Sequence, residues 1–477
     1  MKIKGNHLFN IIITLTGLGV FLFAQETQAQ ISGLKKPNII YVMADDLGYG
    51  DLGCYGQQRI QTPRLDRMAE EGVRFTQHYA GSTVCGPSRA SLLTGKHMGH
   101  ASLRGNPRWT SVGKPVDMPA EEVTVAEELK RAGYTTGIVG KWGLAEAGLE
   151  FMPLYQGFDY FYGFRKHLTA HNYYPEILWE NNDPFHPEGN DKETKSGQYS
   201  HDSLTSKAFH FIKQNAGNPF FLYLAYTVPH YELTVPGDSK EPYKKLDWEE
   251  RKMPAKRGSY YHDPDGNVTY AAMVSRMDRD MGKLFDLLKT LGIDENTLVI
   301  FTSDNGHEYD KGFFNSNGPL KGHKRDLYEG GIRIPFIARW PGEIQPGSVN
   351  DHISAFWDFL PTACDIAGVR PAGNIDGISY LPTLRGQKQE AHEYLYWEFN
   401  ERQGPIQAIR KGNWKAVKFY KKPLELYDLS KDIGEENNVA NKHAKVVTEF
   451  EQLFTGARQD NPYFPLTPHP RVANKFK

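Results

Sequence analysis

The sequence is poor in cysteine: its 477 residues contain three, Cys54, Cys85 and Cys364. Three cysteines cannot form a disulfide scaffold or a four-cysteine zinc site, and they leave at least one thiol unpaired. We expect Cys54 and Cys364 to be free and buried. By the usual size of domains, this length suits one large domain with an appendage, or about two to three ordinary domains.

An excess of charge of either sign is also missing. Lys and Arg total 56, Asp and Glu total 57, and the formal net charge is −1. A general nucleic-acid binder carries a strongly basic surface, so this class is excluded. Charged residues make up 24% and aromatic residues 13% of the chain, which is the composition of a globular protein and not of a disordered one.

Long apolar runs are absent except at the N-terminus. Lys2 and Lys4 precede the apolar segment 8–24, and the segment 27–29 supplies small residues where a signal peptidase cuts. This pattern predicts a secretory signal peptide over 1–29. An uncleaved anchor is disfavoured because the apolar run is shorter than a span of about 20 residues. We expect an exported protein, periplasmic or secreted, without stable membrane insertion after cleavage.

Short apolar strands that alternate with amphipathic helices predict the fold class. Uninterrupted apolar strands suit a parallel sheet that is covered on both faces. The predicted strands are 37–44, 135–139, 220–226, 298–302 and 335–338, and the predicted helices are 64–71, 123–132 and 270–291. The pattern indicates an α/β protein with a large, mostly parallel mixed sheet sandwiched by helices.

The pattern changes toward the C-terminus. The predicted elements there are a helix over 351–368, strands over 394–399, 406–410 and 414–419, and a helix over 441–454. We therefore predict a catalytic α/β domain over 30–388 and a C-terminal α+β subdomain over 389–477, with an antiparallel sheet and a terminal helix. The polar stretch 236–267 is expected to be a long surface excursion that can cover the active site.

The segment around Cys85 carries the most informative chemical pattern. Residues 85–96 read Cys-Gly-Pro-Ser-Arg-Ala-Ser-Leu-Leu-Thr-Gly-Lys, which places a thiol at a predicted helix start. The positive end of a helix dipole and its free amides favour an anion or a thiolate there. Arg89 would direct its guanidinium at the same anion. From these residues alone, a buried structural cysteine is the alternative.

Oxygen-bearing side chains follow two of the predicted strands. Asp45 and Asp46 come directly after the first strand, and Asp304 and Asn305 follow the strand 298–302. Chemistry in such sheets gathers at the carboxyl ends of the strands. Oxygen ligands select Ca²⁺ or Mg²⁺ over Zn²⁺, which prefers nitrogen or sulfur. Turn formation and helix capping are the alternative roles of Asp and Asn after strands.

Together these elements resemble the signature of the formylglycine-dependent (type I) sulfatases, the arylsulfatase family of the alkaline phosphatase superfamily. The family's Cys-x-Pro-Ser-Arg element and its Leu-Thr-Gly-Lys extension match within 85–96, and other elements follow in the family's order. Those elements are Asp45–Asp51, Gly140–Trp142, Val228–His230, Ser303–Gly306, Lys324–Arg333, Leu426–Leu429 and Glu435–Asn438. The similarity extends from about Lys36 to the last predicted helix.

The resemblance implies a nucleophile and a metal ion. A formylglycine-generating maturase would oxidise Cys85 to Cα-formylglycine (3-oxoalanine), whose hydrate attacks the sulfur. One Ca²⁺ would be held by Asp45, Asp46, Asp304, Asn305 and the modified Cys85. This cation would bind a sulfate oxygen and lower the pKa of the nucleophile.

The resemblance also implies the residues that handle charge and protons. Arg89, Lys141 and Lys324 would surround the sulfate and stabilise the charge on its oxygens in the transition state. His230 would protonate the departing alkoxide oxygen. Without the family context, these lysines would be assigned to a solvated face and the histidine to a structural role.

One position departs from the family pattern. The family usually reads Gly-Lys-Trp-His-Leu-Gly, whereas residues 140–145 read Gly-Lys-Trp-Gly-Leu-Ala, so Gly143 stands where a histidine usually contacts the formylglycine. Either another group takes this role, or water and the metal shell suffice, or the protein is a weak or inactive enzyme. His97, His100 and His171 are the candidate replacements.

The residues and the resemblance together predict an exported sulfuric ester hydrolase. Its expected substrates are sulfated carbohydrates of polysaccharides or glycosaminoglycans, with galactose-type sugars as the first expectation. His100, Arg104, His171 and His323 are expected to bind the substrate. Two alternatives remain open: a phosphonate or phosphate-ester hydrolase of the same superfamily, and a non-catalytic relative that binds sulfated glycans, which Gly143 motivates.

Overall fold

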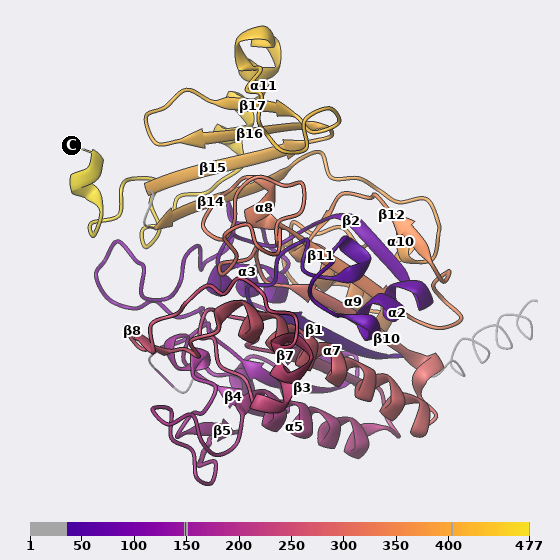
Figure 1. Ribbon diagram of the computed structural model, residues 1–477. Coiled ribbons are helices and arrows are strands. Elements are labelled where there is room, and N and C mark those ends of the chain that lie inside the picture. Colours follow the sequence, from indigo (N-terminus) through magenta and orange to yellow (C-terminus); the bar gives the residue numbers. More distant parts are fainter. Residues whose placement is uncertain (1–35, 147, 149–150, 402–403, 477) are drawn as a thin grey trace, which may run out of the picture. The chain divides into compact units, whose positions relative to one another are not determined.

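A mixed sheet of 11 strands runs through the chain from Pro37 onward, in the order β12-β2-β11-β10-β1-β7-β3-β4-β5-β6, with β13 paired to β2 (Figure 1). The strands are β1 Asn38–Ala44, β2 Val73–Tyr79, β3 Thr135–Lys141, β4 Tyr160–Phe164, β5 Leu178–Glu180, β6 Asp183–Phe185, β7 Phe220–Ala225, β10 Thr297–Ser303, β11 Arg333–Arg339, β12 Ser348–Asn350 and β13 Ser354–Ala355. The central strands β10, β1, β7, β3 and β4 are parallel, whereas β11 is antiparallel to β10 and β2. The predicted α/β class with a large mixed sheet is confirmed.

The computed structural model describes residues 36–476, apart from 147, 149–150 and 402–403. The predicted signal peptide over 1–29 lies outside the described residues. No helix in the described part of the chain has the length and apolar character needed to cross a bilayer.

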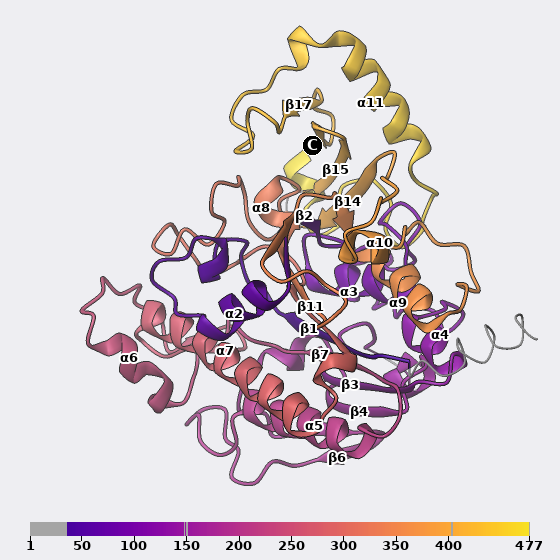
Figure 2. The ribbon, with the colours of Figure 1, turned by 90° about the vertical axis from the view of Figure 1, so that its right-hand side faces the viewer.

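Helices cover both faces of the sheet (Figure 2). Alternate residues of β1 enter different apolar clusters, since Ile40 and Val42 pack with one cluster and Ile39 and Tyr41 with the other. On the first face lie α2 (Pro63–Glu71), α5 (Ser200–Asn215) and α7 (Gly266–Thr290), and on the second lie α3 (Cys85–Thr94), α4 (Val125–Arg131) and α9 (Phe359–Ala367).

Short elements connect these layers. They are η1 Gly53–Tyr55, η3 Pro153–Tyr155, η4 Leu168–His171, η5 Gly237–Lys240, α6 Glu241–Lys244, β8 Lys256–Arg257, β9 Tyr260–Tyr261, η6 Asp294–Asn296, α8 Glu329–Ile332, η7 Phe356–Asp358, α10 Leu381–Leu384, η8 Ala440–Lys442 and η9 Ala473–Phe476. The predicted excursion 236–267 thus contains η5, α6 and a small hairpin of β8 and β9.

A second, antiparallel sheet forms the C-terminal part of the chain. It consists of β14 Leu395–Glu401, β15 Gly404–Lys411, β16 Trp414–Phe419 and β17 Glu425–Asp428, followed by the helix α11 Ala444–Gly456. This confirms the predicted antiparallel sheet with a terminal helix. An apolar cluster joins Trp397 and Phe399 of this sheet to Tyr79 of the large sheet and to Val84, which precedes α3. The exact domain boundary at 388/389 stays a prediction.

Some elements differ from the prediction. The predicted helix over 351–368 begins only at Phe359, because Ser354–Ala355 pair with β2 and continue the large sheet. The helix α5 and the strand β2 were not predicted, although the apolar positions of α5 lie on one buried face. Cys54, Cys85 and Cys364 are free thiols, but Cys54 is only half-buried in η1, so its predicted burial was wrong.

Candidate active site

The carboxyl ends of β1 and β10 bring the predicted metal ligands together. The two strands are parallel neighbours with Ala44 opposite Ser303, so the residues that follow leave the sheet at one edge. The backbone N–H of Asp46 donates to Asp304 Oδ1 at 3.1 Å, and Asn305 Nδ2 donates to Asp46 Oδ1 at 2.7 Å. Asp46 has a φ of +65°, a left-handed conformation that aspartate tolerates better than most residues.

Unsatisfied oxygens in this group test whether it suits a cation. Among the described residues, Asp45 Oδ1 and Asn305 Oδ1 are buried without a hydrogen-bond partner. Such atoms are rare in proteins unless they bind an ion or water. Ligand atoms of Asp45, Cys85 and Asp304 lie within 4.8 Å of one another. The side chains therefore fit a hard, oxygen-preferring cation such as Ca²⁺.

Buried cations accompany the carboxylates. The pairs are Lys141 Nζ to Asp45 Oδ2 at 2.7 Å, Lys324 Nζ to Asp46 Oδ2 at 2.7 Å, and Arg89 Nη2 to Asp304 Oδ2 at 2.8 Å. Arg89 comes from α3 and Lys141 ends β3, whereas Lys324 lies on the loop before α8. All of these side chains are buried, so each charge depends on its partner for compensation.

The pKa shifts in this group have opposite causes. Burial by itself disfavours the charged ammonium of Lys141, but Asp45 and its neighbours more than offset this and raise the pKa of Lys141. Burial raises the pKa of Asp46 to about 7 against the pull of Lys324, and repulsion from Asp45 adds to the rise. A divalent cation would relieve this repulsion and favour the ionised carboxylates.

Cys85 is the first residue of α3 and is buried beside this charged group. Burial raises the pKa of the Cys85 thiol to about 11, although Lys141 and Lys324 pull it down. An unmodified Cys85 is therefore protonated at neutral pH and is a poor nucleophile.

His171 and His230 lie as a stacked pair above the lysines. Their ring centroids are 3.5 Å apart and the rings are parallel. His171 Nε2 lies 3.1 Å from Lys141 Nζ, and His230 Nε2 lies 3.4 Å from Lys324 Nζ. Burial, followed by the neighbouring rings and ammonium groups, holds the pKa of both histidines well below the ordinary value. Both imidazoles are thus neutral at neutral pH.

A cavity of about 300 Å³ opens over Cys85, His171, His230 and Lys324. Tyr260 of the excursion 236–267 also lines it, with its ring centroid 5.9 Å from that of His230. The excursion therefore does reach over the candidate active site. Arg89 and Lys141 lie behind the cavity wall and are fully buried.

Two of the predicted substrate-binding residues have other partners. Arg104 is buried and donates to Glu398 Oε1 at 3.0 Å. His323 Nδ1 contacts the carbonyl oxygen of Lys324 at 3.0 Å, and about half of its side chain is exposed. Neither residue lines the 300 Å³ cavity, whereas the predicted His171 does.

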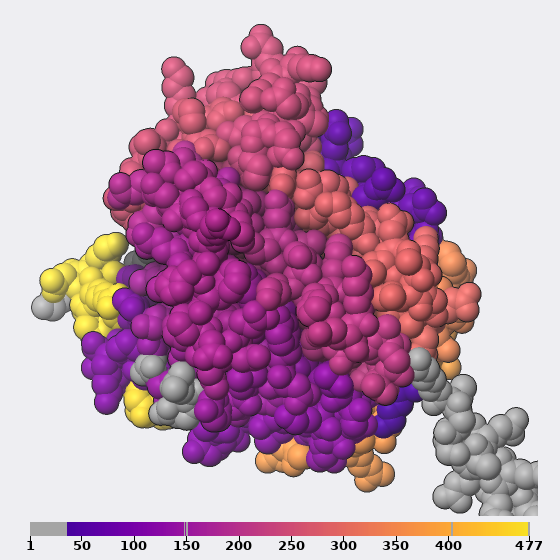
Figure 3. Space-filling view, turned by 90° about the horizontal axis from the view of Figure 1, so that it is seen from below, coloured from indigo at the N-terminus to yellow at the C-terminus, as the bar shows by residue number. Residues whose placement is uncertain are grey.

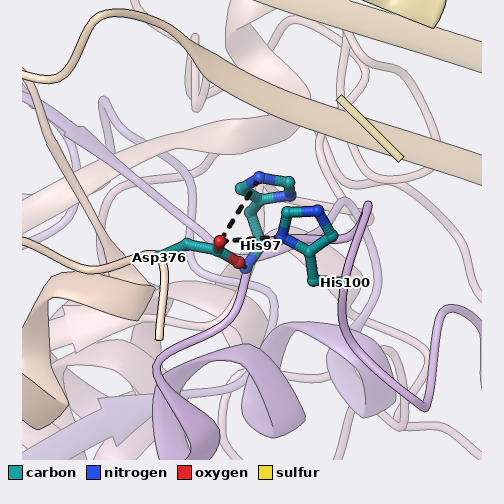
Figure 4. Close-up of side chains that lie close together, drawn as sticks. All are labelled: His97, His100 and Asp376. Atoms are coloured by element: carbon teal, nitrogen blue, oxygen red, sulfur yellow. Dashed lines mark hydrogen bonds and ion pairs between the residues drawn. The ribbon is translucent and has the colours of Figure 1, made fainter. Parts of the chain in front are cut away.

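His100, the remaining predicted substrate contact, belongs to a separate cluster with His97 and Asp376 (Figure 4). His100 Nδ1 lies 2.7 Å from Asp376 Oδ1, and His97 Nε2 lies 3.8 Å from the same oxygen. The backbone N–H of Gly99 donates to His97 Nδ1 at 3.0 Å, so the neutral ring carries its proton on Nε2 and cannot ligate through that atom. The trio is a hydrogen-bonded tie between two loops, and neither histidine lines the cavity.

His167 is a cavity histidine that sequence reasoning did not select. A Cβ atom added at Gly143 would lie 3.8 Å from His167 Nδ1 and 3.3 Å from Lys141 Cε. His167 Nδ1 is buried and has no hydrogen-bond partner among the described residues. The parallel pairing of β3 with β4 places Lys141 opposite Phe164 and so brings the two loops together. Nothing in the sequence marked this proximity, because β4 was not predicted.

Comparison with known proteins places this geometry in a family. A protein-family model described as sulfatase matches residues 37–369. A second family model, described as N-sulphoglucosamine sulphohydrolase, C-terminal, matches residues 322–460. Human arylsulfatase A is 32% identical, over 89% of this chain and 88% of that protein. The N-acetylgalactosamine-6-O-sulfatase of Bacteroides thetaiotaomicron is 30% identical, over 89% of this chain and 93% of its own length. The crystal structure of Ps i-CgsB in complex with k-i-k-neocarrahexaose superposes with a TM-score of 0.78 at 29% identity, covering 93% of this chain and 97% of the other.

Proposed function

Because this chain belongs to the sulfatase family, whose members are sulfuric ester hydrolases, we propose that it cleaves sulfate esters of carbohydrates with a formylglycine derived from Cys85. The observation that carries the proposal is the cavity in which Cys85, Lys324 and His230 meet beside the buried carboxylates. A bound sulfate would face fixed positive charge, a proton carrier and a nucleophile at once.

The carbohydrate substrate class rests on the relatives. One is named N-acetylgalactosamine-6-O-sulfatase, and another was solved in complex with k-i-k-neocarrahexaose. We extend this class to the present chain, with galactose-type sugars as the first to test. The signal peptide predicted over 1–29 would deliver the protein to the periplasm or the medium, where such glycans occur. A formylglycine-generating maturase would be its partner before export is complete.

The proposed enzyme would hold one Ca²⁺ through Asp45, Asp46, Asp304, Asn305 and the modified side chain at position 85. When bound, the ion supplies positive charge to the sulfate oxygens and activates the nucleophile. Lys324 lines the cavity and would hold a sulfate oxygen directly.

Lys141 and Arg89 act from behind the cavity wall. Their pairing with Asp45 and Asp304 keeps both side chains charged and immobile. Fixed charges of this kind stabilise the transition state without having to reorganise.

His230 is the proposed general acid. Its neutral imidazole must first gain a proton, and the negative charge of a bound sulfate ester raises its pKa toward that state. The proton comes from water that enters the cavity, because, against the effect of burial, Asp46 and Glu308 raise the pKa of Lys324 and keep its ammonium charged at 3.4 Å from His230 Nε2. His230 would then give the proton to the departing alkoxide oxygen.

Replacing His230 with alanine is expected to lower kcat/KM for a sulfated sugar about 100- to 10,000-fold, the usual contribution of a general acid. The loss for 4-nitrophenyl sulfate should be much smaller, because a nitrophenolate leaves without protonation. Initial rates of both substrates, measured side by side, check this. The control is His210→Ala, which removes an exposed histidine of α5. An equal loss on the two substrates would assign His230 to sulfate binding instead.

We propose that His167 takes the role that Gly143 cannot supply. The unpartnered Nδ1 of His167 lies at the volume that a side chain at position 143 would enter, so it can exchange a proton with the group at position 85. This makes the absence of the family histidine compatible with an active enzyme.

His167→Ala is expected to lower kcat about 10- to 100-fold, in the lower range for loss of a proton-transfer group. The double variant Gly143→His/His167→Ala should recover part of this loss, because the removed ring frees the space. Recovery is only partial since Gly143 has a φ of +73°, which histidine adopts at some cost. Full kcat in His167→Ala, or no recovery in the double variant, would remove His167 from this role.

The assay that tests the proposed function is a panel of sulfated mono- and oligosaccharides screened for free sulfate, alongside a matched phosphate diester. We expect sulfate release to have the larger kcat/KM. A larger kcat/KM for the diester would favour the phosphonate or phosphate-ester alternative. Fully formylated protein that binds a sulfated glycan but releases no sulfate would favour the non-catalytic one.

A further inference from the structure

Residues 461–472, which we name the C-terminal strap, follow α11 and lie along the loop 102–111 (Figures 1 and 3). The contacts are Asn461 Nδ2 to Ser102 O at 2.9 Å, Ser111 N to Tyr463 O at 3.0 Å, and His469 Nε2 to Thr110 O at 2.9 Å. Phe464 and Val472 are buried. The strap is thus fixed in place by hydrogen bonds and by apolar packing.

The strap adds Arg471 to the wall of the active-site cavity. Arg471 and Trp109 line the same cavity of about 300 Å³ as Cys85 and His230. The guanidinium carbon of Arg471 lies 4.8 Å from the ring centroid of Trp109, which holds the charge in a defined position. Arg471 is exposed and, within the described part of the chain, forms no ion pair with a carboxylate.

A second arginine that lines the cavity, Arg108, is already partly neutralised. Arg108 is about half exposed and pairs with Glu146 at 3.0 Å. Among the described residues, Arg471 therefore has an orienting ring and no carboxylate partner. A guanidinium of this kind offers a planar set of donors suited to a carboxylate or a sulfate.

The strap lies beyond the part of the chain that the family models match. Those matches end at residue 460, whereas the nucleophile, lysines and metal-type ligands lie within 37–369. Shared chemistry would be expected inside the matched region, and substrate selection can vary outside it. The position of Arg471 therefore suits recognition of a particular glycan.

Resting on the proposed function, we propose that Arg471, oriented by Trp109 and assisted by Arg108, binds a second acidic group of the substrate. This group is a sulfate or a carboxylate on the sugar next to the one that loses its sulfate. The cavity is at the small end of the range for ligand pockets, so it suits one sugar unit with its neighbour at the mouth. The preferred substrate is then an oligosaccharide with more than one negative charge.

The test compares Arg471→Gln with the unchanged enzyme on matched probes. The probes are 4-nitrophenyl sulfate, a monosulfated monosaccharide, a disulfated disaccharide of the same sugar, and a monosulfated disaccharide that contains a uronic acid. Arg471→Gln should lower kcat/KM about 10- to 100-fold on one or both doubly charged disaccharides, the usual effect of losing a charge-assisted hydrogen bond. The two singly charged probes should change less than about twofold. A loss on the disulfated disaccharide indicates that Arg471 binds a sulfate, and a loss on the disaccharide with the uronic acid indicates that it binds a carboxylate.

Three further variants sharpen the test: Arg385→Gln, Trp109→Ala and the double variant Trp109→Ala/Arg471→Gln. Arg385→Gln is the matched control, because Arg385 also stacks on a tryptophan, Trp340, at 5.6 Å but lies outside the cavity. If Trp109 acts by orienting Arg471, kcat/KM of the double variant on the doubly charged disaccharides should be no lower than that of the more impaired single variant, Trp109→Ala or Arg471→Gln. Thermal unfolding of each variant confirms that it is folded.

The outcomes separate this subsite from the proposed function. If the unchanged enzyme releases sulfate from sugars but Arg471→Gln alters all probes equally or none, the subsite is rejected and the function stands. If the unchanged, formylated enzyme releases sulfate from no sugar, the proposed function and the subsite that rests on it are both rejected.

Discussion

Replacing Cys85 with alanine is expected to abolish sulfate release, with kcat falling about 10⁵- to 10⁶-fold, as loss of the nucleophile does in other covalent hydrolases. The fold should be retained, because Cys85 caps no helix through its side chain and an alanine suits the first turn of α3. Circular dichroism and the midpoint of thermal unfolding check the fold, and sulfate release checks the activity.

Mass spectrometry of the unchanged protein can show whether the thiol of Cys85 is modified. The peptide that contains Cys85 should be about 18 Da lighter than its sequence mass, as conversion of a thiol to an aldehyde requires. Because an unmodified thiol cannot form the hydrated aldehyde that attacks the sulfur, protein produced without a maturase should be inactive although folded. Cys54→Ala is the control, since Cys54 is a half-buried thiol that does not line the cavity. An active enzyme with an unmodified thiol at position 85 would contradict the proposal.

The positions of the residues around Cys85 could be predicted because each lies where a simple rule places it. Asp45 and Asp304 follow apolar strands that read clearly as parallel, and parallel neighbours end at one edge. Lys141 ends another such strand. Periodicity and motif therefore locate the centre of the site without knowledge of the tertiary fold.

The walls of the cavity could not be predicted in the same way. His167 follows a strand whose glycine and aromatic residues give no clear alternation, and its closeness to Gly143 depends on the pairing of β3 with β4. Arg471 comes from a strap far along the chain that shows no regular pattern until it packs against another loop. Arg104 illustrates the converse, because it was expected to bind the substrate whereas Glu398 pairs with it in the interior.

Removal of Ca²⁺ is expected to lower kcat/KM about 1,000-fold. A Lewis-acid cation lowers the free energy of the transition state by several kcal/mol, and a loss of that size corresponds to this factor. The buried Asp45, Asp46 and Asp304 repel one another, and among the described residues Asn305 Oδ1 has no hydrogen-bond partner, so a cation would compensate this site. Chelation followed by gel filtration gives the metal-free enzyme, and titration with Ca²⁺ should restore the rate. The midpoint of thermal unfolding should rise with Ca²⁺ concentration, because a ligand of the folded state stabilises it by mass action.

Two variants decide which cluster binds the ion. Asn305→Leu should weaken Ca²⁺ binding by about 10- to 100-fold or more, since it removes a ligand oxygen and places an apolar group in the site. Asp376→Asn should leave the Ca²⁺ dependence unchanged, because the trio of His97, His100 and Asp376 is a hydrogen-bonded tie. If Asp376→Asn abolished Ca²⁺ binding and Asn305→Leu did not, the ion would belong to the trio. The buried carboxylates at the ends of β1 and β10 would then be compensated by Lys141, Lys324 and Arg89 alone, and those cations would no longer be free to act on a sulfate.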